Sequence, residues 1–189
     1  VQNDSSVTFS FSFTDNANGQ ASITVTAIDS SGSDSDQFIL TVTEVNDAPV
    51  ANAGLFSTDE DIDVSYQLTW DDGDPWGSAA DDQDSTFAIV DSTLHGTLSL
   101  DVSTGALTYD PDDDYNGSDS FTFTVTDDGT TNGTSDPLTS TASTVSITVN
   151  AINDAPVLSS ISAQTTSEDS DMEVNLSGTD VDIATNGQS

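Results

Sequence analysis

Residues 121–127 read FTFTVTD, in which apolar and polar residues alternate with a period of two. Successive side chains of a β-strand point to opposite faces of the sheet, so this alternation predicts a strand with one buried face and one face in water. Aromatic and β-branched residues hold the apolar positions, as strands favour. The same pattern recurs over residues 7–13, 23–25, 38–42 and 145–149.

Polar clusters separate these runs and are typical of turns. Asp, Asn and Gly gather at residues 71–73, 112–117 and 127–133, and their backbone preferences favour turns over strands. No segment of the sequence shows a sustained helical period. We therefore expect an all-β chain of short, half-buried antiparallel strands.

The chain also contains an internal repeat of about 107 residues. Four pairs of segments define it: residues 44–50 with 151–157, 60–61 with 168–169, 72–74 with 180–182, and 18–19 with 116–117. Their offsets are 107, 108, 108 and 98 residues. The registers predict the C-terminal half of one repeat at 1–47, a complete repeat at 48–153 and the N-terminal half of a third at 154–189. A unit of this length with about seven strands fits an immunoglobulin-like β-sandwich.

Four motifs of the complete repeat follow one another in a specific order: HGTLSL at 95–100, LTYDP at 107–111, YNGSDSFTFTVTDDG at 115–129 and NDAP at 153–156. Together they resemble the bacterial cadherin-like repeats of giant surface adhesins and related exported tandem-repeat proteins. The resemblance implies tandem immunoglobulin/cadherin-like antiparallel β-sandwiches. It also implies a calcium-stiffened spacer or adhesion module, located outside the cell or on its surface.

The resemblance further implies calcium ligands where two repeats join, because cadherins bind calcium there through the linker Asp-x-Asn-Asp-Asn-x-Pro. In the first linker (residues 44–49), Glu44, Asn46 and Asp47 match the leading positions of that motif, but the second Asn is missing and the proline falls one residue early. In the second linker (residues 151–156), Asn153 and Asp154 match, while an alanine replaces the leading carboxylate. The alternative is a simple inter-domain turn in which Asn and Asp satisfy backbone groups.

Acidic residues at fixed distances from the linkers complete the expected ligand set. The Asp-x-Asp motifs at 72–74 and 180–182 resemble the motif that the following cadherin domain contributes, and the Glu-Asp pairs at 60–61 and 168–169 resemble its Glu-bearing motif. Ca²⁺ takes six to eight oxygen ligands. The expected ligands are Glu44, Asn46, Asp47, Glu60, Asp61, Asp72, Asp74, Asn153, Asp154, Glu168, Asp180 and Asp182. The alternative at these motifs is a solvated acidic loop.

Two other acidic segments remain ambiguous in the sequence. The segment Asp127-Asp128-Gly129 is either a further ligand or, as we favour, a hairpin turn of the Asp-Gly kind. The run of three aspartates at 112–114 more often marks a solvated loop, although adjacent carboxylates also recruit cations.

The charge of the chain excludes several classes of partner. The sequence has 34 Asp and Glu, no Lys or Arg and one His, for a formal net charge of -34. Nucleic acids and anionic membrane surfaces are bound through Lys and Arg, so neither is expected as a direct partner. No apolar run approaches the ~20 residues that a membrane-spanning helix needs. The first four residues, VQND, are unlike a signal peptide, and we expect a mature or internal segment.

Catalysis is not expected, so the chain is predicted not to be an enzyme. Without Cys, Lys or Arg, only carboxylates and His95 are available for proton transfer, and His95 is expected to pack or to lie on the surface. A carbohydrate-binding module on a secreted protein is the alternative function, using Trp70, Trp76 and nearby Asp residues on cell-surface glycans. A halophile's acidic surface is a rival explanation of the charge.

The two half-repeats also predict a partner. Each half is expected to expose an apolar sheet face and unpaired strand edges. The tail of one copy and the head of the next are then expected to complete one sandwich, giving a head-to-tail fibre. Alternatively, the chain is one period of a longer repetitive polypeptide, with adjacent repeats meeting head to tail.

Overall fold

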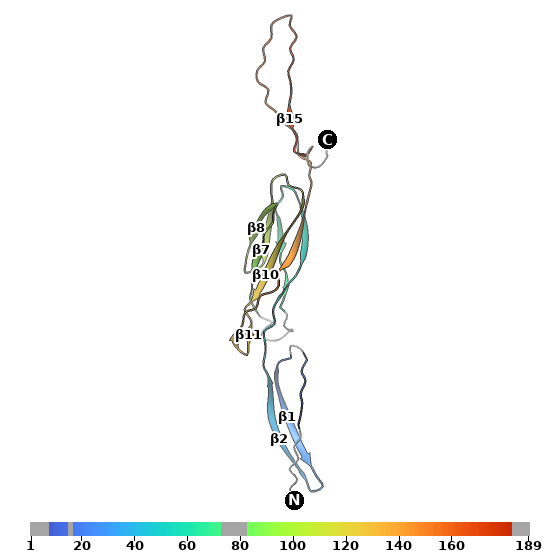
Figure 1. The fold of residues 1–189 in the computed structure, drawn as a ribbon, viewed down its shortest axis with the longest axis vertical. Coiled ribbons are helices and arrows are strands. Elements are labelled where there is room, and N and C mark those ends of the chain that lie inside the picture. Colours follow the sequence, from blue (N-terminus) through green and yellow to red (C-terminus); the bar gives the residue numbers. More distant parts are fainter. Residues whose placement is uncertain (1–7, 15–16, 73–82, 183–189) are drawn as a thin grey trace.

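The computed structural model describes residues 8–14, 17–72 and 83–182, and these ranges are built from β-strands (Figure 1). The strands are β1 (Gly19–Ile28), β2 (Ser33–Val42), β3 (Val50–Ala51), β4 (Gly54–Asp59), β5 (Val64–Gln67), β6 (Trp70–Asp71), β7 (Ser85–Asp91), β8 (Gly96–Leu100), β9 (Ala106–Pro111), β10 (Gly117–Asp127), β11 (Thr130–Thr131), β12 (Thr134–Ser135), β13 (Ser143–Asn150), β14 (Val157–Leu158) and β15 (Gly178–Thr179). The predicted all-β fold is confirmed. Among the described residues, no helix has the length and apolar character needed to span a membrane.

Two sheets form a sandwich from residues 50–150, which we call the middle sandwich. One sheet has the strand order β4-β13-β10-β7, and the other has the order β5-β9-β8. The pairs are antiparallel, as expected, except that β4 runs parallel to β13. A period of two reports which face of a strand is buried and says nothing of its direction, so this parallel pair was not predictable from the pattern.

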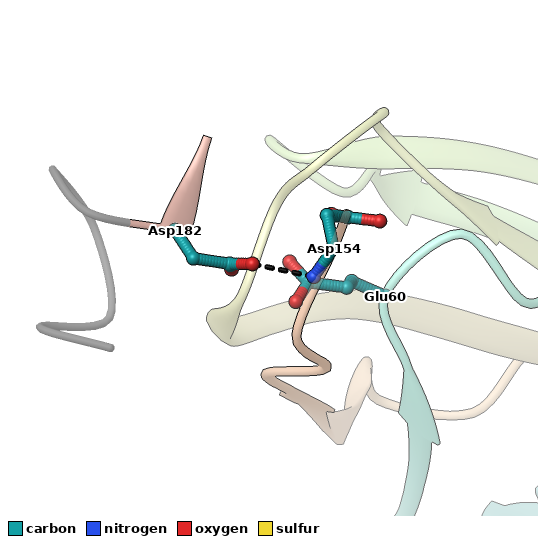
Figure 2. A group of neighbouring side chains, drawn as sticks. All are labelled: Glu60, Asp154 and Asp182. Carbon is teal, nitrogen blue, oxygen red and sulfur yellow. Dashed lines mark hydrogen bonds between the residues drawn. The ribbon is translucent and has the colours of Figure 1, made fainter. Parts of the chain in front are cut away.

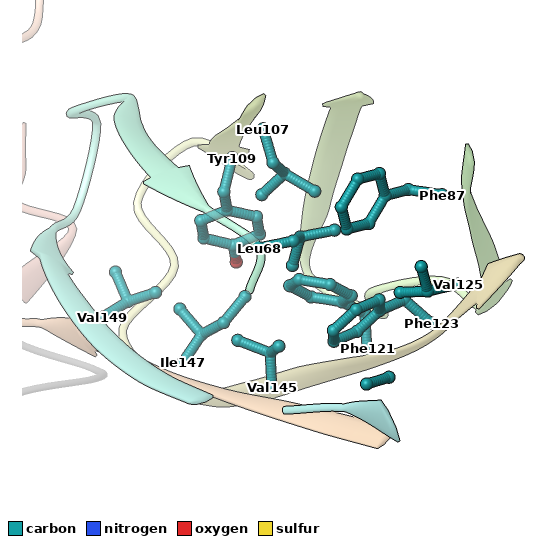
Figure 3. Close-up of a cluster of buried hydrophobic side chains, with 11 residues drawn as sticks. Leu68, Phe87, Leu107, Tyr109, Phe121, Phe123, Val125, Val145, Ile147 and Val149 are labelled. Atoms are coloured by element: carbon teal, nitrogen blue, oxygen red, sulfur yellow. The ribbon is translucent and has the colours of Figure 1, made fainter. Parts of the chain in front are cut away.

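The apolar face of the alternating pattern forms the core between these sheets (Figure 3). Along β10, Phe121, Phe123 and Val125 are buried, and the threonines between them face outward and are only half-buried. Burying a side chain of this size contributes about 1.5–3 kcal/mol. The buried cluster comprises Ala51, Leu68, Phe87, Leu107, Tyr109, Phe121, Phe123, Val125, Val145, Ile147 and Val149.

One buried carboxylate ties the loop between β7 and β8 to this core. Asp119 is 9% exposed, and its two oxygens accept hydrogen bonds from the backbone N–H groups of Leu94, His95 and Ser120 and from the Tyr109 hydroxyl. Desolvation opposes ionisation of Asp119, but these hydrogen bonds outweigh it and lower its pKa. The carboxylate therefore takes a structural role inside the sandwich.

The aromatic residues that the sequence singled out have packing roles where they are described. The His95 ring stacks on Tyr115 with ring centroids 4.1 Å apart, in line with the expected packing role. Trp70 is half-buried and packs against the core, as a residue that covers the end of a sandwich does. Trp76 lies outside the described residues.

Smaller units lie at the two ends of the molecule (Figure 1). The head (residues 8–14 and 17–42) contains the antiparallel β1–β2 hairpin, and the tail (residues 157–182) contains the short β14–β15 pair. Both carry exposed apolar side chains, among them Phe9 in the head and Leu176 in the tail. All three units contain paired strands, whereas the buried core belongs to the middle sandwich. The strand expected from the alternation at residues 7–13 was wrong for the described residues 8–13, which form no strand.

Candidate metal centre

Three segments meet at the end of the middle sandwich that faces the tail. Because β4 and β13 run parallel, the loop after β4 and the second linker after β13 leave the same edge. The Glu60 N–H donates to the Asn150 carbonyl over 2.9 Å, which continues the pairing beyond β4. The loop between β9 and β10 lies at the same end, since Asp114 N–H donates to Asp61 Oδ1 over 3.0 Å.

Glu60 holds the second linker against the sandwich. Its side chain is 4% exposed. Oε1 accepts a hydrogen bond from the backbone N–H of Ile152, and Oε2 accepts one from Asn116 Nδ2 at 3.3 Å. A buried carboxylate requires such partners. Glu60 therefore ties the start of the second linker, at Ile152, to the middle sandwich.

Five carboxylates gather there in two groups of three. One oxygen each of Glu60, Asp154 and Asp182 lies within 4.8 Å of the other two, and the same holds for Asp61, Asp114 and Asp154. Asp154 belongs to both groups. Figure 2 shows the first group, in which Asp182 reaches from the tail and accepts a hydrogen bond from the Asp154 backbone N–H. The groups thus join the sandwich, the second linker and the tail.

Two of these carboxylates lie at positions where the loop backbone is left-handed. Asp61 and Asp114 both have left-handed backbone angles, with φ of 62° and 58°. Aspartate tolerates this region better than most residues because its short side chain bonds locally. Asp169, the repeat equivalent of Asp61, has a φ of 64°. The tail therefore carries a second copy of the same acidic turn.

The electrostatics of the groups are unfavourable without a cation. The chain has no Lys or Arg to offset five neighbouring carboxylates. Desolvation, followed by repulsion from Asp182, Asp114 and other acidic neighbours, raises the pKa of Asp154. Desolvation and repulsion, first from Asp61, likewise raise the pKa of Asp114.

The donor chemistry of the two groups fits a hard divalent cation. Asp154 Oδ2 is buried and accepts no hydrogen bond from the described part of the chain, so it retains coordinating capacity. Every side-chain donor in the groups is a carboxylate oxygen, the ligand type that Ca²⁺ prefers. A bound Ca²⁺ would supply the missing positive charge here.

At the first linker, Asn46 is anchored rather than exposed. Its side chain is 4% exposed. Nδ2 donates to Asp127 Oδ1 over 3.0 Å and to the Asp136 carbonyl over 2.9 Å, and Oδ1 accepts a hydrogen bond from Gln83 at 2.9 Å. The linker therefore enters the middle sandwich with a fixed side chain.

Asp127 belongs to this first-linker region. It is 3% exposed, and its Oδ1 also accepts from the backbone N–H groups of Gly129 and Leu138. Its Oδ2 is buried without a hydrogen bond to any described residue. A Cβ at Gly129 would lie 1.9 Å from Asn46 Oδ1, so glycine permits this close approach.

We favoured a hairpin turn at Asp127-Asp128-Gly129, and this position was wrong by a few residues. The tight turn lies at Asn132 and Gly133, with φ of 52° and 72°, between β11 and β12. Positive φ at both central residues is typical of a type I′ hairpin. Asp127 instead ends β10 and faces Asn46.

The remaining acidic residues of the first linker face the head. Glu44 and Asp47 are half-buried and, with Thr14 and Asn18 of the head, line a polar pocket of about 180 Å³. Glu44 Oε1 is buried and accepts no hydrogen bond within the described ranges. Asp72 is half-buried, and Asp74 lies outside the described residues.

Other predicted ligands lie outside the two groups. Asn153 is exposed, and its Nδ2 donates to the Asp154 carbonyl. Asp180 Oδ1 accepts from the Asp182 backbone N–H at 3.1 Å, so Asp180 orients its neighbour. Glu168 is exposed in the tail. The assignment of all twelve residues as metal ligands remains a prediction.

The sequence interpretation missed Asp114, which it favoured as part of a solvated loop. The repeat register carried a usable signal, because Asn116–Gly117 mark the start of β10. That strand is antiparallel to β13 and begins where β13 ends. The loop that precedes β10 must therefore lie beside the second linker.

Comparisons with known proteins agree with this fold. The family model described as "Bacterial Ig domain" matches residues 46–150, and it represents a non-catalytic domain family. No curated protein sequence matches the chain.

Among solved structures, the protocadherin gammaB7 EC3-6 cis-dimer structure has a TM-score of 0.55 at 20% identity and covers 87% of this chain and 43% of that chain. Mouse protocadherin-24 EC1-3 has a TM-score of 0.53 at 15% identity and covers 87% of this chain and 56% of that one. The protocadherin gammaB4 extracellular domain has a TM-score of 0.54 at 18% identity, over 86% of this chain and 28% of that one. This chain thus spans less than two thirds of each of these structures. At such identities the likeness shows the fold alone, which confirms the resemblance to cadherin repeats. By its family match, the chain belongs to the bacterial Ig domain family.

Proposed function

We propose that this chain is a structural and adhesive repeat module outside the cell, in which calcium at the repeat junctions stiffens a long surface protein. A bacterial Ig-like module is consistent with a surface repeat protein. The observation that carries the proposal is the meeting of Glu60, Asp154 and Asp182, one carboxylate each from the sandwich, the second linker and the tail. The repeat boundaries at 47/48 and 153/154 remain part of this proposal.

Stiffening follows from the origin of the ligands. Since the three carboxylates come from three segments, a cation that they share would link those segments, and bending at the linker would break its coordination. Without the cation, the same carboxylates repel one another and favour separation. Extracellular modules bind Ca²⁺ with Kd of about 10⁻⁴ to 10⁻³ M, so millimolar calcium would be sufficient.

Calorimetric titration, thermal melts and small-angle scattering of the full chain test the proposal. Calcium is expected to bind and to raise Tm beyond the effect of NaCl at matched ionic strength. At a hundredfold excess over Kd, ligand binding stabilises the native state by about 2.7 kcal/mol. Scattering is expected to report a more rigid particle in calcium than in EGTA.

Asp154→Asn tests the site most directly, because it removes the carboxylate that both groups share. It keeps the Asp154 backbone N–H, which donates a hydrogen bond to Asp182. It should weaken calcium binding and restore flexibility. Asp171→Asn, at an exposed acid of the tail outside both groups, is the matched control. Identical Tm and scattering in calcium and EGTA would refute the calcium role, and stabilisation by molar salt alone would favour the halophilic explanation.

A further inference from the structure

We propose that the middle sandwich bears tension along the chain, and that the parallel pairing of β4 with β13 is the feature that resists it. This pairing, which we call the parallel ladder, joins six residue pairs, from Gly54 with Val145 to Asp59 with Asn150. The proposal rests on one part of the proposed function, the place of this module in a long surface protein. It makes no use of calcium.

The two linkers transmit tension to opposite ends of the sandwich. The first linker leads through β3 into β4, and β13 leads directly into the second linker. The head lies beyond one end of the sandwich and the tail beyond the other (Figure 1). A pull on both linkers therefore draws β4 towards the head and β13 towards the tail. Since these strands are neighbours, the pull makes them slide along each other.

The direction of this pull decides how the load is shared. The hydrogen bonds of a ladder run between the strands and not along them, and in a parallel pair they are evenly spaced. Sliding the strands stretches all of these bonds together, so the ladder has to break as a whole. If two paired strands are instead pulled apart at one end, the bonds break one after another, and each bears the load alone. The parallel ladder is therefore loaded in its stronger direction.

The order of the sheet concentrates the load on this ladder. β4 lies at the edge of the sheet β4-β13-β10-β7, so its ladder in that sheet is the one with β13. On its other side, β13 pairs with β10 through seven residue pairs, from Gly117 with Val149 to Phe123 with Ser143. Releasing β4 breaks one ladder, whereas releasing β13 breaks two. Tension should therefore separate β4 from β13 first.

The core keeps the ladder in register and away from water. On β13, Val145, Ile147 and Val149 are at most 2% exposed. On β4, Phe56 packs against the core and stacks on Tyr66 with ring centroids 4.7 Å apart. A slip by one residue would turn these side chains to the other face of the sheet, so packing opposes sliding. The low dielectric of the core also strengthens the hydrogen bonds beside it.

Further hydrogen bonds extend the ladder to the point where the second linker leaves the sandwich. Asn150 Nδ2 donates to Asp59 Oδ1 over 3.0 Å, and the Glu60 N–H donates to the Asn150 carbonyl over 2.9 Å. The Glu60 carboxylate then accepts a hydrogen bond from the Ile152 N–H. These bonds join the same two segments as the ladder, at the end where tension enters from the tail. Glu60 and Asn150 therefore share the load.

At the other end, tension from the head meets shorter contacts before it reaches β4. The first is the Asn46 side chain, which is bonded to Asp127 at the end of β10. The second is the β3–β6 pairing, which contains two residue pairs. Both contacts involve residues that precede β4, so they can break while β4 stays on β13. The parallel ladder is therefore expected to set the force at which the sandwich unfolds.

Single-molecule force spectroscopy of the full chain in EGTA tests the direction of loading. The chain has no cysteine, so two introduced cysteines define the points of attachment. Val45→Cys with Ala155→Cys pulls on the two linkers and loads the ladder by sliding. Ile62→Cys with Ala155→Cys pulls on the tail side of both strands and opens the same ladder from one end. All three side chains are exposed. The first pair should require a severalfold higher unfolding force.

A pair of matched variants gives a second readout. Asn150→Ala removes the side-chain hydrogen bond to Asp59 and should lower the unfolding force when the chain is pulled through its two ends. Asp91→Ala is the control, because it removes an exposed side-chain bond between β10 and β7, the one that Thr122 donates. It should leave the unfolding force unchanged. Urea unfolding of both variants measures their equilibrium stability, so that a loss of force can be separated from a loss of stability.

Equal unfolding forces in the two directions would overturn the proposal, and so would equal losses of force in Asn150→Ala and Asp91→Ala. A high force that is present in calcium and disappears in EGTA would also overturn it, because the ladder consists of bonds within the protein. If a cysteine pair does not fold, as checked by circular dichroism, the two alanine variants still decide the question. A directional difference in EGTA supports the ladder even where calcium fails to bind in the titration, a result that contradicts only the calcium function.

Discussion

The middle sandwich and the head carry the same alternating pattern, but they bury it to different extents. Phe123 is 0% exposed in the middle sandwich, whereas its repeat equivalent Val25 is 37% exposed in the head. Val25 lies on β1 and pairs with Asp36 of β2, and Phe123 lies on β10 and pairs with the equivalent residue, Ser143, of β13. The difference shows that the pattern determines which face is apolar, while the opposite sheet determines whether that face is buried.

The largest difference in stability is expected when the equivalent apolar residues of the two units are truncated. Phe123→Ala should destabilise the middle sandwich by about 3–5 kcal/mol, since it removes a large, fully buried ring. The equivalent Val25→Ala should change the same transition by less than about 0.5 kcal/mol, as for an exposed site. Urea unfolding followed by circular dichroism measures both. Equal losses would mean that head and middle sandwich unfold as one unit.

A smaller effect is expected from the buried carboxylate of the middle sandwich. Asp119→Asn should cost about 1–3 kcal/mol at neutral pH, because backbone donors and a tyrosine hydroxyl lose a charged acceptor. The hydrogen bonds lower the pKa of Asp119 in the folded state. Its contribution is therefore present above the unfolded pKa and is lost as pH falls through the lowered value.

Urea unfolding at several pH values measures this difference. The gap between wild type and Asp119→Asn should narrow in acid. Asp110→Asn, at an exposed acid of β9, is the control and should show no such trend. A gap that stays constant down to strong acid would mean that Asp119 stabilises the fold by packing alone.

The same contrast explains how much of the structure the sequence predicted. Alternation at 121–125 and 145–149 identified core residues correctly, because a period of two translates directly into sheet faces. The parallel β4–β13 pair, the placement of Asp114 and the burial of Asp127 depend on which loops meet in space. Local pattern holds no such information. The repeat register held part of it, because it fixed the strand starts that bring Glu60, Asp154 and Asp182 to one end.

The smallest expected effect concerns the acidic groups at the second linker, and its sign depends on the metal. Desolvation and the neighbouring carboxylates raise the pKa of Asp114 in the folded state. In EGTA, its ionisation therefore opposes folding, and this cost grows as pH rises from the unfolded pKa through the raised value. Asp114→Asn should then slightly raise Tm in EGTA at neutral pH. In calcium the sign should reverse, because the variant removes a candidate ligand.

Thermal melts of both proteins in EGTA and in calcium, at neutral and acid pH, measure this reversal. Asparagine also tolerates the left-handed backbone that Asp114 adopts, so the substitution tests charge and ligation with little added strain. Asp113→Asn removes a charge from the same exposed loop without removing a member of either group, and it should show no reversal. If Asp114→Asn and Asp113→Asn behave alike in calcium, the loop contributes only diffuse charge, and Asp114 is not a ligand. If only Asp114→Asn changes sign, and the change fades as acid protonates the group, the carboxylate acts through a bound cation.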